Sequence, residues 1–263
     1  MDIAGRTALV TGAAGGLGER LARVLAAEGA RVVLSGRNEA ALSALAEELG
    51  GRALVADLAR RDDVHRLARE AGEVDILVNN AGIELTKRYV DMTDEDLDQM
   101  VAVNLTAPML LTRDLLGGML ERGQGHVVFI ASMSGKVGVS CNEPYAATKA
   151  GLIGLTRSLR AEFRDAPVGF SVVSPGFIAS TGMWERMGAK PPFIAGEAKP
   201  ERVAQMAIKA IRRDLPDVTV NGAPIRPTLA LAALAPGLVD RVSARLGPSR
   251  LFEREAERRR AAG

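Results

Sequence analysis

The sequence predicts an α/β fold: a single domain built on a doubly wound parallel sheet of about seven strands, with helices on both faces. Three observations lead to this prediction. Short apolar segments alternate along the chain with longer segments of helical periodicity. Several of the short segments are apolar throughout, which is typical of parallel strands buried on both faces. A glycine-rich turn joins the first apolar segment to the first helical one.

The composition excludes several classes of protein. The chain of 263 residues is 47% hydrophobic and 25% charged, which is ordinary for a globular protein. Its formal net charge of +2 provides no field for a nucleic-acid partner. One cysteine, Cys141, excludes internal disulfides, and His65 and His126 lack metal-ligand spacing, so we expect no metal. With no visible signal peptide and no apolar run of ~20 residues, we expect a cytoplasmic protein.

The first part of the chain has the order strand, glycine-rich turn, helix, strand. The strands are predicted at Thr7–Val10 and Arg31–Ser35, and the helix at Leu21–Glu28. The turn, residues 11–18, reads TGAAGGLG. Glycines let the main chain approach a pyrophosphate, which then sits at the N-terminus of the helix. This unit predicts a Rossmann-like dinucleotide site, with a plain turn as the alternative.

The end of the second strand bears on the choice between NAD(H) and NADP(H). An acidic residue here binds the ribose hydroxyl in NAD-binding proteins, whereas an arginine suits the 2′-phosphate of NADP. In this chain Ser35 is followed by Gly36, Arg37 and Asn38, and Glu39 opens the next helix. We therefore expect NADP(H), bound through Arg37 and Ser35, with NAD(H) as the alternative. The simpler interpretation is that Arg37 is a solvated residue at the start of a helix.

The alternation of strands and helices continues to residue 220. Pro108 is expected to kink or interrupt the longest helix. The predicted strands are Ala53–Val55, Asp75–Asn79, Val127–Ser132, Phe170–Ser174 and Asp217–Val220, and the predicted helices are Glu39–Leu49, Arg61–Ala71, Thr93–Leu120, Pro144–Phe163 and Pro200–Arg213.

Three polar residues are candidates for function. Asp57 follows the third strand, and it either reaches an adenine edge or caps the next helix. Asn104 lies inside an apolar helical pattern, so its side chain needs hydrogen-bond partners. It either makes a hydrogen bond within the core or contacts a catalytic water. Ser132 lies at the C-terminal end of the fifth strand, where ligands bind in open α/β sheets.

Tyr145 and Lys149 are four residues apart, so they lie one turn apart on the same face of a helix. A free tyrosine titrates near pH ~10 and is a poor base at neutral pH. A neighbouring ammonium and a bound cofactor cation favour the phenolate, so we expect them to lower the pKa of Tyr145. Alone the motif is weak, and a surface Tyr–Lys pair is then the better interpretation.

Together these motifs resemble the short-chain dehydrogenase/reductase family over residues 4–222. The resemblance implies NAD(P)-dependent hydride transfer between a ketone or aldehyde and an alcohol. It implies that Tyr145 is the acid and base, that Ser132 orients the substrate, and that Lys149 binds the nicotinamide ribose. The motifs are TGAAGGLG at 11–18, NNAG at 79–82, Asn104 (which by resemblance holds a water), Ser132, YAATK at 145–149, and Pro175-Gly176.

The cofactor-binding residues are expected along most of the chain. The family often places a threonine five residues after the proline of its PG motif; here Ser180 holds that position and Thr181 follows it, so either hydroxyl is a candidate. The expected cofactor-binding residues are Gly12, Gly16, Leu17, Gly18, Ser35, Arg37, Asp57, Leu58, Asn80, Ala81, Gly82, Tyr145, Lys149, Pro175, Gly176, Ile178 and Ser180.

The substrate side of the site is mostly apolar, which favours a lipophilic or cyclic ketone or alcohol. Residues 180–199 are rich in Gly, Pro and Met, which is typical of a substrate lid. Cys141 is expected to pack rather than to act as a nucleophile. A non-catalytic NADP-binding regulator is the alternative function. The candidate lining residues are Ser134, Val139, Cys141, Asn142, Phe177, Met183 and Trp184.

The chain divides at residue 223 into a catalytic domain, 1–223, and an extension, 224–263. The first interpretation of the extension is a helix that covers the domain or a neighbouring subunit, followed by a solvated charged tail. The alternatives are a membrane-surface or substrate-access helix and disorder past Ser249. The resemblance also implies a homodimer or homotetramer, formed through the helices at 93–120 and 144–163.

Overall fold

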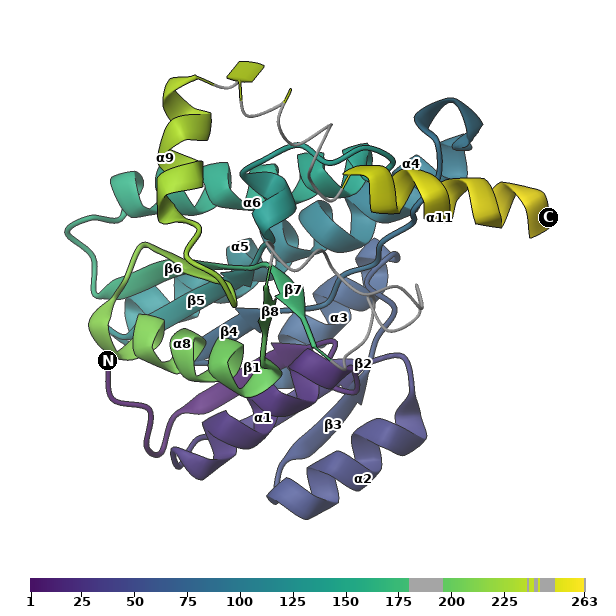
Figure 1. Cartoon of the computed structure of the whole chain (residues 1–263). Coiled ribbons are helices and arrows are strands. Elements are labelled where there is room, and N and C mark those ends of the chain that lie inside the picture. The colour runs from purple at the N-terminus through teal and green to yellow at the C-terminus, as the bar shows by residue number, and fades with distance from the viewer. Residues whose placement is uncertain (180–195, 236, 239–240, 242–248, 263) are drawn as a thin grey trace.

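Seven parallel strands form one sheet in the order β3-β2-β1-β4-β5-β6-β9 (Figure 1). The computed structural model describes residues 1–179, 196–235, 237–238, 241 and 249–262. The strand order changes direction at β1 and β4, which confirms the predicted doubly wound, Rossmann-like topology. The strands are β1 (Thr7–Thr11), β2 (Arg31–Gly36), β3 (Arg52–Val55), β4 (Ile76–Asn79), β5 (Gly125–Ile130), β6 (Val168–Pro175) and β9 (Asp217–Val220).

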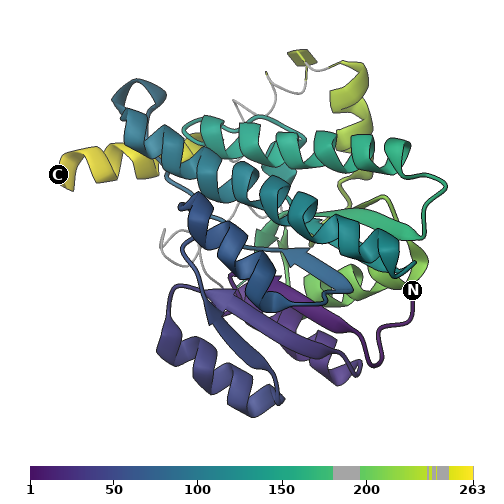
Figure 2. The same ribbon diagram turned by 180° about the vertical axis from the view of Figure 1, so that it is seen from behind.

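Helices cover both faces of this sheet, as predicted (Figures 1 and 2). One face carries α1 (Gly16–Ala27), α2 (Glu39–Leu49) and α8 (Pro200–Arg213). The other face carries α3 (Arg61–Ala71), α4 (Asp94–Val101), α5 (Ala107–Glu121) and α6 (Glu143–Glu162). Each layer buries its own hydrophobic cluster against the strands, so the carboxyl ends of the strands are held in one row.

Short elements connect this framework near the carboxyl ends of the strands. They are the 3-10 helices η1 (Tyr89–Asp91) and η3 (Met133–Gly135), the π-helix η2 (Ala102–Thr106), and a separate parallel pair of β7 (Phe177–Ile178) and β8 (Glu197–Ala198).

The long helix predicted over Thr93–Leu120 is interrupted, but the interruption lies before Pro108 rather than at it. Between α4 and α5 the chain widens into η2, where the amide of Ala107 donates to the carbonyl of Ala102. Pro108 then stands in the first turn of α5. A proline has no N–H, so the main-chain carbonyl of Asn104 has no α-helical donor four residues on. The widened turn accommodates this missing hydrogen bond.

In the described part of the extension, helix α9 spans Arg226–Leu234 and helix α11 spans Ser249–Ala262. The predicted solvated tail is therefore wrong for its last part: α11 is helical, and Phe252 and Ala256 on it are buried. These two residues are one turn apart and give a charged helix an apolar stripe to pack with. Among the described helices, none is long and apolar enough to cross a membrane.

Candidate active site

The glycine-rich turn between β1 and α1 fits a phosphate group. Gly12 has φ +64°, and a Cβ on it would lie 2.9 Å from the Cα of Ala81. A Cβ on Gly18 would lie 2.1 Å from the carbonyl oxygen of Gly12. Asn80 fastens the turn, because its Nδ2 donates to the carbonyl of Thr11 at 2.9 Å. Glycine at both positions lets the turn fold tightly against β4.

The turn leads into the N-terminus of α1, whose first turn is not capped by a side chain. The first amides of a helix have no partner within the helix, and they attract anions. Gly16 and Leu17 lie at this N-terminus, next to Gly18. A tight glycine turn, an uncapped helix start and the carboxyl end of a parallel sheet together fit the pyrophosphate of a dinucleotide.

Of the two residues expected to bind a ribose phosphate, only Arg37 lies at the surface. Arg37 is exposed just after β2, and it makes no hydrogen bond or ion pair within the described part of the chain. Ser35 is 1% exposed and its hydroxyl is buried without a partner there, while its carbonyl accepts the amide of Ala13 at 2.9 Å. The expectation that Ser35 faces the ligand is therefore corrected: its side chain lies inside the sheet.

Asp57 follows β3, and its hydrogen bonds stabilise the turn between β3 and α3. Its Oδ1 accepts the amide of Ala59 at 3.1 Å, and its own amide donates to Oδ2 of Asp63 at 2.9 Å. The carboxylate does not cap α3, because Ala59 lies outside the helix. Leu58 beside it is 8% exposed and packs against α3. Asp57 is half-buried at the carboxyl end of the sheet, which is compatible with an adenine contact.

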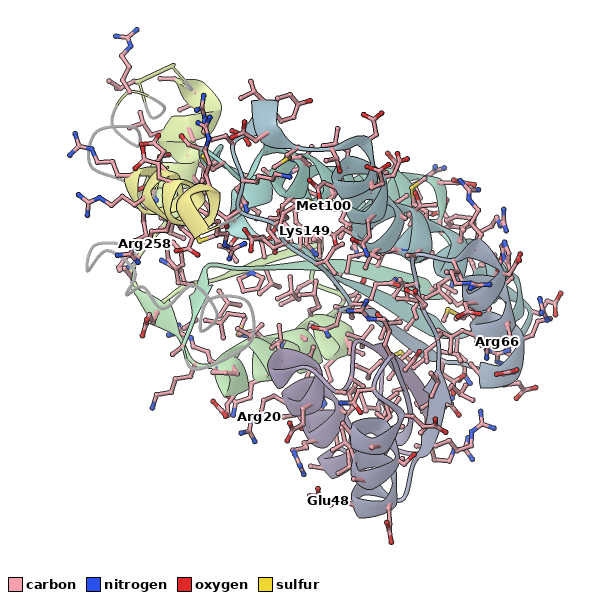
Figure 3. All side chains as sticks on the ribbon, turned by 90° about the vertical axis from the view of Figure 1, so that its right-hand side faces the viewer. Arg20, Glu48, Arg66, Met100, Lys149 and Arg258 are labelled. Atoms are coloured by element: carbon pink, nitrogen blue, oxygen red, sulfur yellow. The ribbon has the colours of Figure 1, made fainter. Side chains whose placement is uncertain are left out.

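Asn104, Gly82 and Lys149 come together from three elements. Asn104 on η2 is fully buried, and its amide group is hydrogen-bonded to the main chain of Ile83. A Cβ on Gly82 would lie 3.4 Å from both Oδ1 of Asn104 and Nζ of Lys149. Lys149 on α6 is 3% exposed, and its Nζ donates to the carbonyl of Ile130 at 2.9 Å. Figure 3 shows Lys149 inside the molecule, unlike the labelled Arg258.

Ser132 and Tyr145 meet where η3 packs on α6. Ser132 lies just beyond the end of β5, and its Oγ accepts the amide of Ser134 at 3.1 Å. A Cβ on Gly135 would lie 2.6 Å from the main-chain carbon of Lys149, so glycine permits this close approach. The hydroxyl of Ser132 hydrogen-bonds the phenol of Tyr145. Nζ of Lys149 lies 5.5 Å from the centre of the Tyr145 ring.

Burial dominates the electrostatics of this group. It raises the pKa of Tyr145 to about 12, although the hydrogen bond from Ser132 acts in the opposite direction. Burial also lowers the pKa of Lys149 to about 8. The expectation that Lys149 lowers the tyrosine pKa is therefore not met in this structure. Desolvation of the phenolate is the largest cause of the raised pKa of Tyr145.

Sequence reasoning missed Glu84, a carboxylate beside this group. Its Oε1 accepts hydrogen bonds from Nδ2 of Asn142, at 3.1 Å, and from the hydroxyl of Thr86. Its negative charge contributes to the raised pKa of Tyr145. Glu84 lies two residues after the NNAG motif, in the loop that follows β4, and this position was the only signal that pointed to it.

The substrate-side candidates fall into two groups. Cys141 is 8% exposed, with its thiol pKa raised by burial, and Asn142 is 2% exposed; Ser134 is partly exposed on η3, and Phe177 is partly buried on β7. Ser180, Thr181, Met183, Trp184 and residues 181–195 of the expected lid lie outside the described residues.

The loop expected beside the nicotinamide follows β6. Pro175 is the last residue of β6, and Ile178 is half-buried on β7. A Cβ on Gly176 would lie 2.2 Å from Oδ1 of Asn221, so this turn also requires glycine. Within the described residues, no group of His, Cys, Asp or Glu is arranged to hold a metal ion.

The fold and this group of residues define a nicotinamide-nucleotide-dependent oxidoreductase. A family model described as short chain dehydrogenase matches residues 6–192. The chain therefore belongs to the short chain dehydrogenase family, as the motifs indicated.

Individual relatives agree with this assignment. Ketoacyl reductase HetN of Nostoc sp. is 37% identical over 271 residues, covering 98% of this chain and 94% of HetN. The 3-oxoacyl-(acyl-carrier-protein) reductase FabG of Rickettsia typhi is 37% identical over 182 residues, covering 68% of this chain and 76% of FabG. A short-chain dehydrogenase from Sphingobium yanoikuyae, solved in complex with NADPH, has a TM-score of 0.78 and 28% identity, covering 89% of this chain and 95% of that one.

Proposed function

We propose that this oxidoreductase is an NADP(H)-dependent reductase of ketones or aldehydes, with Tyr145 as its acid and base and a lipophilic substrate. The observation that carries the proposal is the meeting of Ser132, Tyr145 and Lys149 at the carboxyl end of β5. In open α/β sheets this edge is where ligands bind. The glycine-rich turn lies at the same edge of the sheet, after β1.

Each of these residues has a role in this mechanism. When bound, the nicotinamide cofactor supplies or accepts the hydride. Ser132 holds the carbonyl oxygen of the substrate at hydrogen-bond distance from Tyr145. Tyr145 donates its proton to that oxygen as negative charge develops. With a pKa of about 12, the phenol is protonated at neutral pH, so it has the proton that a general acid needs for reduction.

Lys149 and Asn104 complete the mechanism at the cofactor side. Lys149 is held between the carbonyl of Ile130 and the Tyr145 ring. From this position it would bind the nicotinamide ribose. Asn104 holds a water through its main-chain carbonyl, since its side chain is bonded to Ile83. These two residues would return a proton to Tyr145 from solvent.

The preference for NADP(H) rests on Arg37. No carboxylate stands at the end of β2, and the exposed guanidinium of Arg37 is available to a ribose 2′-phosphate. The relative from Sphingobium yanoikuyae, which was solved with NADPH, supports the same choice. We expect Arg37→Ala to raise the KM for NADPH by roughly tenfold or more and to leave the KM for NADH unchanged.

The substrate class is inferred from the lining residues and from the relatives. Val139, Cys141 and Phe177 form an apolar cluster after the ends of β5 and β6. Two relatives carry names that specify ketoacyl or 3-oxoacyl substrates. We therefore favour a ketone that bears an apolar chain, with a cyclic ketone as the second candidate.

The experiment that tests this proposal follows the oxidation of NADPH by absorbance with 3-oxoacyl thioesters, aliphatic and cyclic ketones, and aldehydes. NADH is measured in parallel. Tyr145→Phe should lower kcat by at least about 100-fold. The matched control is Tyr89→Phe, since Tyr89 is the other tyrosine of the chain and is 58% exposed. Tight NADPH binding without turnover of any of these compounds would instead support a non-catalytic regulator.

We also infer a homodimer or homotetramer formed through the α4–α5 and α6 layer. Val101 at the end of α4 is 43% exposed and Met109 on α5 is 46% exposed. Exposed apolar residues on adjoining helices suit a subunit interface. Light scattering should give two or four times the chain mass of 27.7 kDa. A monomer at micromolar concentration would contradict this inference.

A further inference from the structure

The helix α11 packs on the segments that follow β5 and β6, next to the candidate active site. At its first residue, the hydroxyl of Ser249 accepts the amide of Ser140 at 3.4 Å. Near its last turn, Arg260 lies 4.0 Å from the carboxylate of Asp91 on η1. Both contacts are with segments at the carboxyl edge of the sheet, and Figures 1 and 2 show α11 beside these segments from opposite sides. Both ends of α11 therefore contact segments at the carboxyl edge of the sheet.

Between these two ends, α11 contributes two buried residues to an apolar cluster. Phe252 is 7% exposed and Ala256 is 3% exposed. They pack with Cys141, which precedes α6, and with Val139 and Phe177. Phe177 follows β6, whereas Val139 and Cys141 follow β5, so Phe252 joins the two segments that flank the site. Three residues of this cluster are those expected to line the substrate pocket.

The cluster lies next to the proposed reacting groups. Cys141 and Asn142 immediately precede α6, and Tyr145 lies in its first turn. Nδ2 of Asn142 donates to Glu84, the carboxylate whose charge raises the pKa of Tyr145. Cys141 has φ +59°, a conformation that residues other than glycine rarely adopt. Strained main chain of this kind is concentrated at functional sites.

The extension lies beyond the family model, which ends at residue 192. The alignment with ketoacyl reductase HetN nevertheless covers 98% of this chain, so it includes most of α9 and α11. The outward face of α11 is charged, with Arg250, Arg254 and Arg258 exposed at intervals of four residues. Only its inward face is apolar, and that face lies on the lining residues.

We propose that α11 is the outer wall of the substrate pocket and that Phe252 is a specificity-determining residue, which sets how large an apolar group can stand beside the reacting carbonyl. The proposal rests on the proposed function, because it names a part of the same substrate site. The phenyl ring of Phe252 limits the size of the pocket. Its removal creates space that a branched or longer apolar chain of the substrate can fill.

The first test measures kcat/KM for NADPH-dependent reduction across ketones of increasing size. Phe252→Ala should lower kcat/KM at least about tenfold for the smallest ketones, which lose contacts, and raise it for the bulkiest. The matched control is Phe163→Ala, because Phe163 is a partly buried phenylalanine at the far end of α6, where its ring contacts that of Phe170. An unchanged ranking of substrates in Phe252→Ala would overturn the proposal.

A second readout does not depend on turnover. Cys141 is the chain's only cysteine, and Phe252 packs on it. The rate at which the thiol reacts with an aromatic disulfide reagent therefore measures whether α11 covers Cys141. The thiol should react at least about tenfold faster in Phe252→Ala than in the wild-type protein, at matched thermal stability. The same slow rate in both proteins would show that α11 does not cover Cys141, and would overturn the proposal even if the enzyme is active.

The two readouts separate failure of this proposal from failure of the proposed function. Suppose that the wild-type protein reduces no ketone, but that Phe252→Ala exposes the thiol of Cys141. The proposed reductase function is then wrong, and α11 covers Cys141 without a role in substrate binding. Should the alanine variant not fold, Phe252→Leu replaces it, since leucine keeps much of the apolar contact. Faster thiol reaction with an unchanged ranking would mean that α11 only covers the site, and would overturn the specificity role.

Discussion

Asn104 bonds both main-chain polar groups of Ile83: its Oδ1 accepts the amide at 2.8 Å, and its Nδ2 donates to the carbonyl at 2.8 Å. This pair of bonds ties the π-helix η2 to the loop after β4. The loop carries Gly82, which lies against Lys149. The asparagine side chain is therefore a clamp that sets the distance between two parts of the candidate site.

Asn104→Ala should destabilise the fold by roughly 2–4 kcal/mol, because it leaves two partly buried groups of Ile83 without partners. Urea unfolding measures the effect. The matched control is Asn38→Ala, in which an exposed asparagine that caps α2 is lost. That change should cost about 1 kcal/mol. If the two variants lose equal stability, the clamp at Ile83 is not a strong contact.

Lys149 should make the protein more stable as the pH rises above neutrality. Burial lowers its pKa from 10.5 in the unfolded chain to about 8 in the folded protein. Between these values the unfolded chain binds the additional proton, so unfolding becomes less favourable as pH rises. This contribution is fully present above pH 10.5 and is lost as pH falls through about 8. From pH 7.5 to pH 9.5 it amounts to roughly 2 kcal/mol.

The measurement compares urea unfolding of the wild-type protein and Lys149→Met across that pH range. The variant also loses the bond to the carbonyl of Ile130, but that loss does not vary with pH. The difference in unfolding free energy between the two proteins should therefore grow in favour of the wild type. Lys209→Met, at an exposed position of α8, should show no such trend. Parallel curves for Lys149→Met would contradict the lowered pKa.

The elements of the fold were predictable because their signals are local. The helix Arg61–Ala71 and the strand Asp217–Val220 have the bounds that their patterns predict. The close approach of Gly18 to the Gly12 carbonyl is a property of a short turn, so the motif alone reveals it. The parallel direction of the strands follows from their alternation with helices.

Features that depend on distant segments were not predictable. Whether Tyr145 is buried depends on what covers it, so the sign of its pKa shift could not be read from its spacing to Lys149. Ser35 looked like a ligand of the cofactor because the end of β2 could be placed only to within a residue or two. The packing of Phe252 on Cys141 joins residues more than a hundred positions apart, and no periodicity records such a contact.

His126 should make the protein sensitive to acid. Burial lowers its pKa to about 4, from 6.5 for a free histidine, and the charge of Asp214 only partly opposes this. Nε2 lies 2.8 Å from the hydroxyl of Ser171, which itself donates to the carbonyl of Leu215, so Nε2 is the protonated nitrogen of a neutral ring. Its contribution to stability is present above pH 6.5 and is lost as the pH falls toward 4.

Between pH 6.5 and pH 4.5 this group should cost the folded protein roughly 2 kcal/mol. His126→Gln keeps an N–H donor for Ser171 but does not titrate, so its unfolding free energy should fall less over that range. His65→Gln serves as the control, because His65 is the only other histidine and is partly exposed. Equal acid sensitivity of His126→Gln and the wild type would show that other groups account for it.

Gly135 and Gly138 offer a test of how closely η3 must approach α6. A Cβ on Gly135 would lie 2.6 Å from the main-chain carbon of Lys149 and 2.7 Å from the amide nitrogen of Ala150, whereas a Cβ on Gly138 would meet nothing within 4 Å. In Gly135→Ala the turn that carries Ser132 must move away from the helix. A shift of about 1 Å in a positioning group can lower the rate by about 100-fold.

We therefore expect Gly135→Ala to lower kcat for ketone reduction by about 100-fold and Gly138→Ala to lower it by less than about twofold. The affinity for NADPH, measured by fluorescence titration, should change little in either variant, because the glycine-rich turn lies on a different loop, between β1 and α1. Thermal unfolding separates a local shift from loss of the fold. A Gly135→Ala enzyme with wild-type kcat would mean that the hydroxyl of Ser132 does not need this distance from Tyr145.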